Sequence, residues 1–272
     1  MNRPMRFAGP HMFYPNDPIE IIQWKEKILS QWSPPLPSFQ SVYSAIVPHA
    51  GFMYSGSVAL KTLSSIPFPD TVVIVGVNHT GIGRPLSVWP TGKWETPFGW
   101  IPVDEELASE MIEQDPHFES DCKAHAEEHS IEVILSLLAS FTTTIKVLPI
   151  TMGYQDVKTT EELGNILVAL PTNRHLFVIA SCDMSHYVSK EKAFSDDQKV
   201  LDHWHSLRWK EAIETVERNN LSVCGVGPGS AASFYAAKKG AQKGLLLDHT
   251  HSGEVTGDTN AVVSYAGVLF VS

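Results

Sequence analysis

Apolar residues along this chain follow two patterns, helical spacing and short continuous runs, which alternate from one end to the other. Residues 20–32 carry apolar side chains at helical spacing and stop before Pro34-Pro35, which predicts a helix followed by a linker. Residues 71–76 read Thr-Val-Val-Ile-Val-Gly, an almost wholly apolar run that is typical of a central parallel strand buried on both faces. The chain therefore combines buried strands with amphipathic helices.

The same two patterns predict the remaining elements. We expect strands at residues 41–47, 145–150, 175–181, 244–248 and 261–271, and helices at residues 57–64, 104–114, 129–141, 156–170, 192–206, 209–219 and 228–240. Residues 80–102 contain four glycines, four prolines and three tryptophans, and we expect an irregular excursion there. Because strands alternate with helices without a repeat or composition break, residues 1–272 are predicted to form a single-domain α/β/α layered sandwich with a mostly parallel or mixed central sheet.

Composition and charge narrow the class of protein. The 272 residues are 43% hydrophobic and 18% charged, as in a globular protein large enough to bury a core without disulfides. The formal net charge of −10 argues against nucleic acid as a partner, since phosphate binding needs a basic face. No apolar run approaches the roughly 20 residues of a membrane span, and no signal-peptide core follows the first residues. The three cysteines lack a CxxC pair, so we expect a protein of the reducing cytoplasm without a membrane partner.

Histidine, cysteine and aspartate gather in short motifs rich in glycine, proline and serine, most of them where a predicted strand ends. The motifs are residues 47–51 (Val-Pro-His-Ala-Gly), 76–81 (Gly-Val-Asn-His-Thr-Gly), 125–130 (His-Ala-Glu-Glu-His-Ser), 181–187 (Ser-Cys-Asp-Met-Ser-His-Tyr), 224–229 (Cys-Gly-Val-Gly-Pro-Gly), 248–251 (Asp-His-Thr-His) and 252–258 (Ser-Gly-Glu-Val-Thr-Gly-Asp). Proteins of the α/β class build metal and catalytic pockets from such groups at strand ends. The motifs therefore predict a metal-binding protein and a candidate enzyme.

Two of these motifs present histidines in matching contexts. His49 lies two residues and His79 three residues beyond a predicted strand, and each has a glycine two residues later. If the two strands are neighbours, both imidazoles reach the same sheet edge, as two metal ligands or an acid–base pair do. A turn histidine bonded to backbone is the alternative for either residue alone, and the matching contexts favour function.

A third motif offers a thiol. Cys224 precedes a predicted helix, and the positive end of that helix is expected to lower the pKa of the thiol toward the thiolate that binds metals. An inert packed thiol is one alternative. A phosphate-binding glycine loop is another, which Pro228 weakens because it removes an amide donor.

Two further pairs have catalytic spacing. Asp183 lies three residues before His186, close enough for its carboxylate to orient the imidazole as a general base, although a turn that caps a helix is the alternative. His125 and His129 share one face if their segment is helical, but Ala126 stands where a zincin motif has glutamate. A Ser-His-Asp hydrolase is also conceivable, yet no Gly-x-Ser-x-Gly elbow supports it.

In this order the motifs resemble the Memo family, which includes bacterial and archaeal Memo-like proteins. The resemblance spans almost the whole chain and is carried by Ala8-Gly9, Phe13-Tyr14-Pro15, residues 47–51, Tyr54-Ser55-Gly56, Gly76 with Asn78-His79, Trp94 with Thr96-Pro97 and Gly99, Val103-Asp104, Glu128-His129-Ser130 with Glu132, Ser181 with residues 183–187, Cys224-Gly225 with Gly227-Pro228, and Ser252-Gly253 with residues 255–258. Val77 stands where we expect proline, and Cys182 where we expect serine.

The family is akin to class III extradiol ring-cleaving dioxygenases, which hold non-haem Fe(II) by two histidines and a carboxylate. The resemblance implies a metal site of His49, His79 and Cys224, and catalytic roles for Asp183 and His186. It further implies that the pocket and its outer shell contain His125, His129, Tyr54, Tyr187, Asn78 and Cys182.

The thiol changes the expected chemistry. Replacing the dioxygenases' carboxylate by a thiolate softens the site, which favours copper, zinc or thiolate-bound iron, and ring cleavage does not carry over. We therefore expect a Memo-like, metal-dependent redox enzyme that uses iron or copper and acts on a small-molecule or peptide ligand. A non-catalytic ligand- or peptide-binding scaffold and a zinc hydrolase acting through metal-bound water are the alternatives.

Overall fold

A mixed β-sheet forms the centre of the molecule. The computed structural model describes residues 1–33, 41–114, 118–170 and 176–272. Within these ranges the main sheet has nine strands in the order β10-β12-β2-β9-β3-β8-β4-β7, with β11 paired to β12, and a small sheet has the order β1-β5-β6. The strands are β1 (Asn2–Arg3), β2 (Val42–Val47), β3 (Thr71–Val77), β4 (Leu86–Val88), β5 (Lys93–Thr96), β6 (Gly99–Pro102), β7 (Glu119–Ser120), β8 (Lys146–Met152), β9 (Leu176–Ser181), β10 (His186–Val188), β11 (Lys243–His251) and β12 (Val262–Val271).

The middle of the main sheet is parallel. Strand β9 pairs with β2 on one side and with β3 on the other, and β3 pairs with β8, all in parallel. The flanking pairs β12–β2, β11–β12 and β4–β8 are antiparallel. The predicted α/β class with a mixed central sheet is therefore confirmed.

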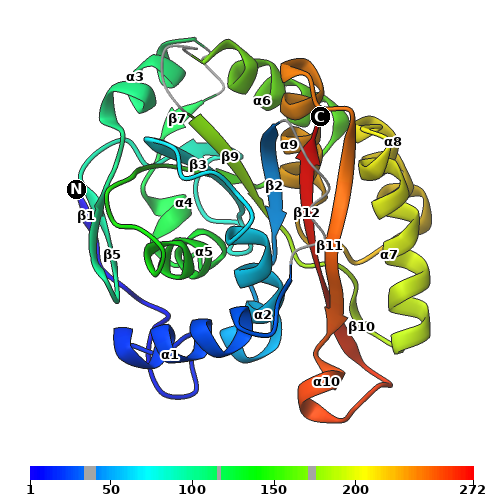
Figure 1. The fold of residues 1–272 in the computed structure, drawn as a ribbon. Coiled ribbons are helices and arrows are strands. Elements are labelled where there is room, and N and C mark those ends of the chain that lie inside the picture. Colours follow the sequence, from blue (N-terminus) through cyan, green and yellow to red (C-terminus); the bar gives the residue numbers. More distant parts are fainter. Residues whose placement is uncertain (34–40, 115–117, 171–175) are drawn as a thin grey trace.

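Helices cover both faces of this sheet (Figure 1). They are α1 (Pro18–Leu29), α2 (Phe52–Leu63), α3 (Glu105–Gln114), α4 (Lys123–Ala126), α5 (Ser130–Ala139), α6 (Val157–Ala169), α7 (Lys190–His205), α8 (Trp209–Asn219), α9 (Val226–Lys239) and α10 (Gly253–Thr256). No helix in the described ranges is long and apolar enough to cross a membrane.

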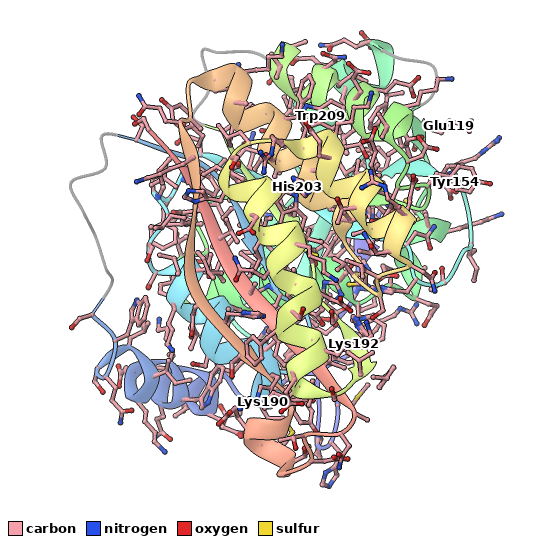
Figure 2. The ribbon with its side chains drawn as sticks, turned by 90° about the vertical axis from the view of Figure 1, so that its right-hand side faces the viewer. Glu119, Tyr154, Lys190, Lys192, His203 and Trp209 are labelled. Atoms are coloured by element: carbon pink, nitrogen blue, oxygen red, sulfur yellow. The ribbon has the colours of Figure 1, made fainter. Side chains whose placement is uncertain are left out.

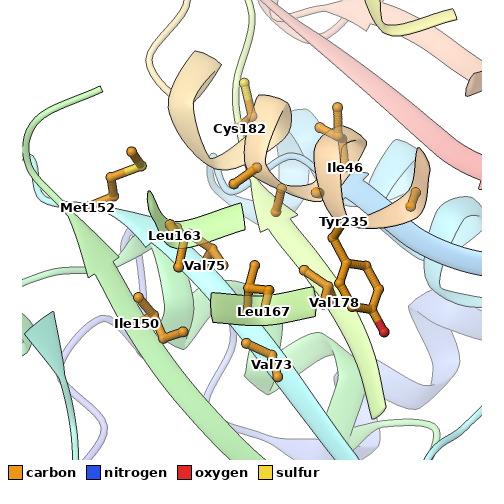
Figure 3. Packing of buried hydrophobic residues seen from close by; sticks show 14 of the residues in the cluster. Ile46, Val73, Val75, Ile150, Met152, Leu163, Leu167, Val178, Cys182 and Tyr235 are labelled. Carbon is orange, nitrogen blue, oxygen red and sulfur yellow. The ribbon is translucent and has the colours of Figure 1, made fainter. Parts of the chain in front are cut away.

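Strand β3 shows how one strand serves both faces. Its side chains alternate in direction, so Val72 and Ile74 pack with α1, α2 and α5, while Val73 and Val75 pack with α3 and α6–α9. Figure 3 shows Val73 and Val75 between the sheet and α6. On the same face, α7 contacts α8, because His203 Nε2 of α7 lies 3.0 Å from Thr215 Oγ1 of α8. Figure 2 shows α7 lying along the outside of the molecule. The continuous apolar run of β3 is explained by burial on both sides.

Several predicted boundaries differ from the structure. Residues 80–102 are not irregular throughout, because they contain β4, β5 and β6. Helix α2 begins at Phe52, five residues before the predicted start at residue 57, and its N-cap is Gly51, which has no side chain to signal a helix start. The short elements β1, β7, β10, α4 and α10 were not predicted. Residues 34 and 35 of the predicted linker and residue 175 of a predicted strand lie outside the described residues.

The N-terminal segment is attached to α5 by buried charge. Arg3, with a side chain 1% exposed, forms an ion pair with Glu132, donates to the backbone oxygens of His125 (3.0 Å) and Glu128 (2.8 Å), and lies over the Trp94 ring. Glu132 also accepts the hydroxyl of Tyr14 at 2.7 Å. These contacts tie residues distant in sequence to the loop between α4 and α5.

This attachment predicts that removing the Arg3 side chain strongly destabilises the fold. Arg3→Ala leaves the Glu132 carboxylate buried without its cation, so the free energy of unfolding should fall by about 3–5 kcal/mol. Arg6→Ala is the matched control, because Arg6 forms an ion pair with Glu127 in which the two side chains are 43% and 60% exposed. Loss of this exposed pair should lower the free energy of unfolding by no more than about 1 kcal/mol. Urea unfolding of both variants measures the difference, and equal effects would contradict the role given to Arg3.

Candidate metal centre

The candidate site lies where three parallel strands end. Val47, the last residue of β2, is in register with Ser181, the last residue of β9, and β3 ends on the other side of β9. Two residues beyond β2 and β3 come His49 and His79. The common direction of the strands thus delivers both histidines to one edge of the sheet, as expected from their sequence contexts.

Three imidazoles and one thiol meet at this edge. Among the described residues, one ring nitrogen each from His49, His79 and His129 lie within 4.8 Å of one another. The Cys224 Sγ atom lies 3.6 Å from His49 Nε2 and also hydrogen-bonds His79. Nitrogen and sulfur donors at this spacing can close around an ion with metal–ligand bonds of about 2.0–2.3 Å.

His49 is held by β9. Its backbone N–H donates to Asp183 Oδ1 at 2.7 Å, and its Nδ1 lies 2.6 Å from Ser181 Oγ. Because the Ser181 hydroxyl donates its proton to the Ser130 carbonyl oxygen at 2.8 Å, His49 Nδ1 is the donor to Ser181. The nitrogen left for a metal is Nε2. Burial alone would lower the pKa of His49, but the charges of Asp183 and Cys224 outweigh it and raise that pKa.

One carboxylate holds the other two imidazoles. Glu128, 1% exposed, accepts the His79 backbone N–H at 2.7 Å, and its Oε1 lies 3.0 Å from His79 Nδ1 and 3.4 Å from His129 Nδ1. Burial raises the pKa of Glu128, but the hydrogen bond and charge of His79 bring it down to about 2. A carboxylate behind a metal-facing imidazole fixes its tautomer and direction, so both rings are left with Nε2 for an ion.

His79 and His129 of this cluster differ in how strongly they bind a proton. Burial lowers the pKa of His79, but hydrogen bonds from Cys224 and Glu128 reverse this and raise it to about 10. Burial and the charge of His49 lower the pKa of His129 to about 4, despite the opposing charge of Glu128. At neutral pH His79 therefore holds its proton and His129 does not.

Cys224 is held by close backbone packing. A Cβ atom on Gly225 would lie 2.4 Å from the Ser181 carbonyl oxygen, so only glycine lets this loop reach the end of β9. Gln155 Nε2 donates to the Cys224 carbonyl oxygen at 2.7 Å. The expected low pKa of Cys224 is wrong for the metal-free protein, because burial and a hydrogen bond with Cys182 raise it to about 12 despite His49.

The expected pairing of Asp183 with His186 is also wrong. His186 Nδ1 lies 2.7 Å from the Met184 carbonyl oxygen and 2.8 Å from that of Ser222. Asp183 instead holds the His49 backbone and places its Oδ2 atom 4.0 Å from His49 Nε2. A spacing of three residues did not bring these side chains together because β10 starts at His186 and turns it away.

His125 and Asn78 do not belong to the cluster. Residues 125–129 are not one helix, because α4 ends at Ala126 and α5 begins at Ser130, so the condition for His125 and His129 to share a helix face is not met. His125 is fully buried between Trp89 and Trp94, and burial with the charge of Arg3 lowers its pKa to about 3. The Asn78 side chain bonds within its own turn, to Thr80, Gly81 and Ile82.

The other predicted pocket residues lie around the cluster. Cys182 is fully buried at the end of β9, where its thiol contacts Cys224. Burial and the charge of Asp183 raise the pKa of Tyr265, and Tyr54 and Tyr187 add to this, so Tyr54, Tyr187 and Asp183 all lie near Tyr265. The Tyr187 side chain is 78% exposed.

Three residues that hold the ligands were not among the predicted site residues. Glu128, Ser130 and Ser181 occur in the sequence motifs, but nothing in their spacing shows that Ser181 contacts His49, that Glu128 contacts His79 or that Ser130 contacts Val77. Ser130 Oγ donates to the Val77 carbonyl oxygen at 3.1 Å and so fixes α5 to the end of β3. The only signal available was that Glu128 directly precedes His129 in a motif rich in polar residues.

Fold and site together define an α/β protein with a histidine–cysteine cluster at the carboxyl ends of its parallel strands. The sequence profile described as Memo-like protein matches residues 3–269, and the chain belongs to this family. It is 37% identical to a MEMO1 family protein of Methanopyrus kandleri over 99% of both chains, and 41% identical to one of Methanosarcina mazei over 85% of this chain and 86% of the relative.

A solved structure has a similar fold. The crystal structure of an uncharacterized Escherichia coli K12 protein superposes with a TM-score of 0.59, covering 85% of this chain and 100% of that one. At 16% identity this similarity concerns the fold alone.

The proton held by His79 predicts a pH dependence of the metal-free protein. Because the folded-state pKa of about 10 exceeds the ordinary 6.5, its contribution to stability is complete below pH 6.5 and is lost as the pH rises to about 10. With EDTA present, the free energy of unfolding should fall across this range more steeply in the wild type than in His79→Ala. Urea unfolding at several pH values measures both slopes, and equal slopes would refute the assignment.

Proposed function

We propose that this protein holds one iron or copper ion by His49, His79 and Cys224 and acts as a metal-dependent redox enzyme. The observation that carries the proposal is the convergence of three imidazole nitrogens within 4.8 Å, with the Cys224 sulfur 3.6 Å from His49 Nε2. His129 is a fourth donor of the same cluster. Mixed imidazole and thiolate donors suit copper, zinc and iron better than magnesium or calcium.

The surrounding residues support a metal site over a structural polar cluster. Each of the three histidines has its Nδ1 directed at a partner, Ser181 for one and Glu128 for two, so that Nε2 is the nitrogen turned toward the centre. This arrangement matches the outer-shell contacts of metal-binding histidines.

When bound, an iron or copper ion supplies one-electron redox chemistry that the side chains lack. Among the chain's own groups, Asp183 is the best placed to accept a proton from a ligand at the cluster, since its Oδ2 lies 4.0 Å from His49 Nε2. Asp183 thus replaces His186 as the proposed acid–base group. The substrate is proposed to be a small molecule or peptide.

A second candidate function is ligand binding without turnover. A cavity of about 620 Å³, a usual size for a ligand site, is lined by residues 9–17 together with Glu20, Ile21, Trp24, Phe52 and Met53. Its wall includes Phe13, whose ring centroid is 4.4 Å from that of His129. An apolar ligand in this cavity would contact the other side of the wall that supports the histidine cluster.

Elemental analysis of protein purified without chelator or nickel resin tests these proposals. We expect near-stoichiometric iron or copper. The variants His49→Ala, His79→Ala and Cys224→Ser should remain folded and lose metal affinity. Loss of an outer-shell partner lowers metal affinity by roughly 10–100-fold, and loss of a ligand should lower it by more.

His186→Ala is the matched control, because His186 contacts backbone oxygens outside the cluster and its variant should retain the metal. Thermal unfolding with EDTA verifies that each variant is folded. Metal-free wild type with an intact fold would favour the ligand-binding candidate, and stoichiometric zinc would favour a hydrolase.

The role of Glu128 gives a separate prediction. Glu128→Gln keeps the shape but removes the charge that orients His79 and His129, so metal affinity should fall by about 10–100-fold. The neighbouring Glu127→Gln is the control, because Glu127 is 60% exposed and pairs only with Arg6 among the contacts described. Competition titrations against a chelator measure both variants. Equal affinities would show that Glu128 does not act on the ligands.

A further inference from the structure

The two cysteines at the end of β9 lie in direct contact. The thiols of Cys182 and Cys224 both donate to the Asp183 carbonyl oxygen, at 3.3 Å and 3.4 Å. In the ranges described, neither takes part in a disulfide. Two thiols bonded to the same oxygen atom are close neighbours in the folded chain.

The backbones of the two segments are also close enough. A Cβ atom on Gly225 would lie 2.7 Å from both Cα and Cβ of Cys182, so no side chain separates the loop of Cys224 from the end of β9. A disulfide requires Cα atoms about 4.4–6.8 Å apart. Segments packed this tightly can satisfy that requirement without movement of the strand.

The pair differs in access to solvent. Cys182 is fully buried in the core cluster that includes α9 (Figure 3), whereas Cys224 is partly exposed. A reagent from solvent therefore reaches Cys224 first. Cys182 is the buried thiol that can then react with the oxidised Cys224. Cys122, the third cysteine, packs against the core cluster on the opposite face of the sheet.

We propose that Cys182 and Cys224 form a reversible disulfide under peroxide, and that this bond removes the Cys224 sulfur from the histidine cluster. The disulfide itself needs no metal, while its effect on metal binding rests on the proposed function.

The chemistry balances with hydrogen peroxide as the oxidant. The Cys224 thiol first passes its proton to His49 Nε2, 3.6 Å away, and the sulfur then attacks one peroxide oxygen. The O–O bond breaks, the departing oxygen takes up that proton, and a sulfenic acid and one water form. The Cys182 sulfur then attacks the sulfenic sulfur, the S–O bond breaks, and the hydroxide leaves with the Cys182 proton as a second water. Two thiols lose two electrons, peroxide gains them, and a dithiol such as dithiothreitol reverses the bond.

Peroxide treatment of the EDTA-stripped full chain tests the pair. After denaturation and alkylation, the thiol count should fall from three to one, with a peptide containing Cys182 linked to one containing Cys224 and a mass lower by two hydrogens. Metal titration of the oxidised protein should show loss of binding that dithiothreitol restores. Cys122→Ser is the matched control and should form the same link.

Cys182→Ser and Cys182→Ala remove the inner thiol. Without it, Cys224 should proceed to sulfinic acid, and dithiothreitol should no longer restore metal binding. Wild-type protein in which Cys182 stays free while Cys224 becomes sulfinic acid would overturn the proposal. A reversible link in a protein that bound no metal before oxidation would support the thiol pair and overturn the proposed function.

Discussion

The parallel pairing of β2, β9 and β3 is the constraint on which the site depends. Parallel strands end at the same edge of a sheet, so three chain segments that are far apart in sequence emerge side by side. The register of Val47 with Ser181 then sets His49 against Ser181. A shift of one residue would turn these side chains to the other face of the sheet and separate the donors.

Buried charge keeps the rest of the cluster in place. His129 and Glu128 lie on the loop between α4 and α5, outside the sheet, and that loop is held by Arg3 through the Glu128 carbonyl oxygen. Arg3 also forms an ion pair with Glu132, which lies in the first turn of α5. Such pairs add little net stability over apolar packing, but they define which conformation the loop adopts, because a misplaced loop would leave a buried charge without a partner.

The sequence identified site residues only where they stood in a recognisable setting, a glycine-rich turn next to a predicted strand or helix. His49, His79 and Cys224 stood in glycine-rich turns, two of them directly after strands, and the structure brings them together. Short spacing misled for Asp183 and His186, because separation along the chain does not tell which way a side chain leaves the backbone. The pKa of Cys224 could not be predicted either, since burial outweighs the helix end, and burial depends on segments distant in sequence.

By itself the sequence determined the α/β class, the order of most long elements and the family, because these follow from hydrophobic periodicity and from motifs that are local in the chain. It also indicated that histidines and a thiol occupy strand ends. Only the tertiary structure decided that His129 joins the cluster, that Glu128 orients two imidazoles, and that Cys182 touches Cys224. These contacts join residues from different elements, and they exist because packing and strand register, not local pattern, place those elements together.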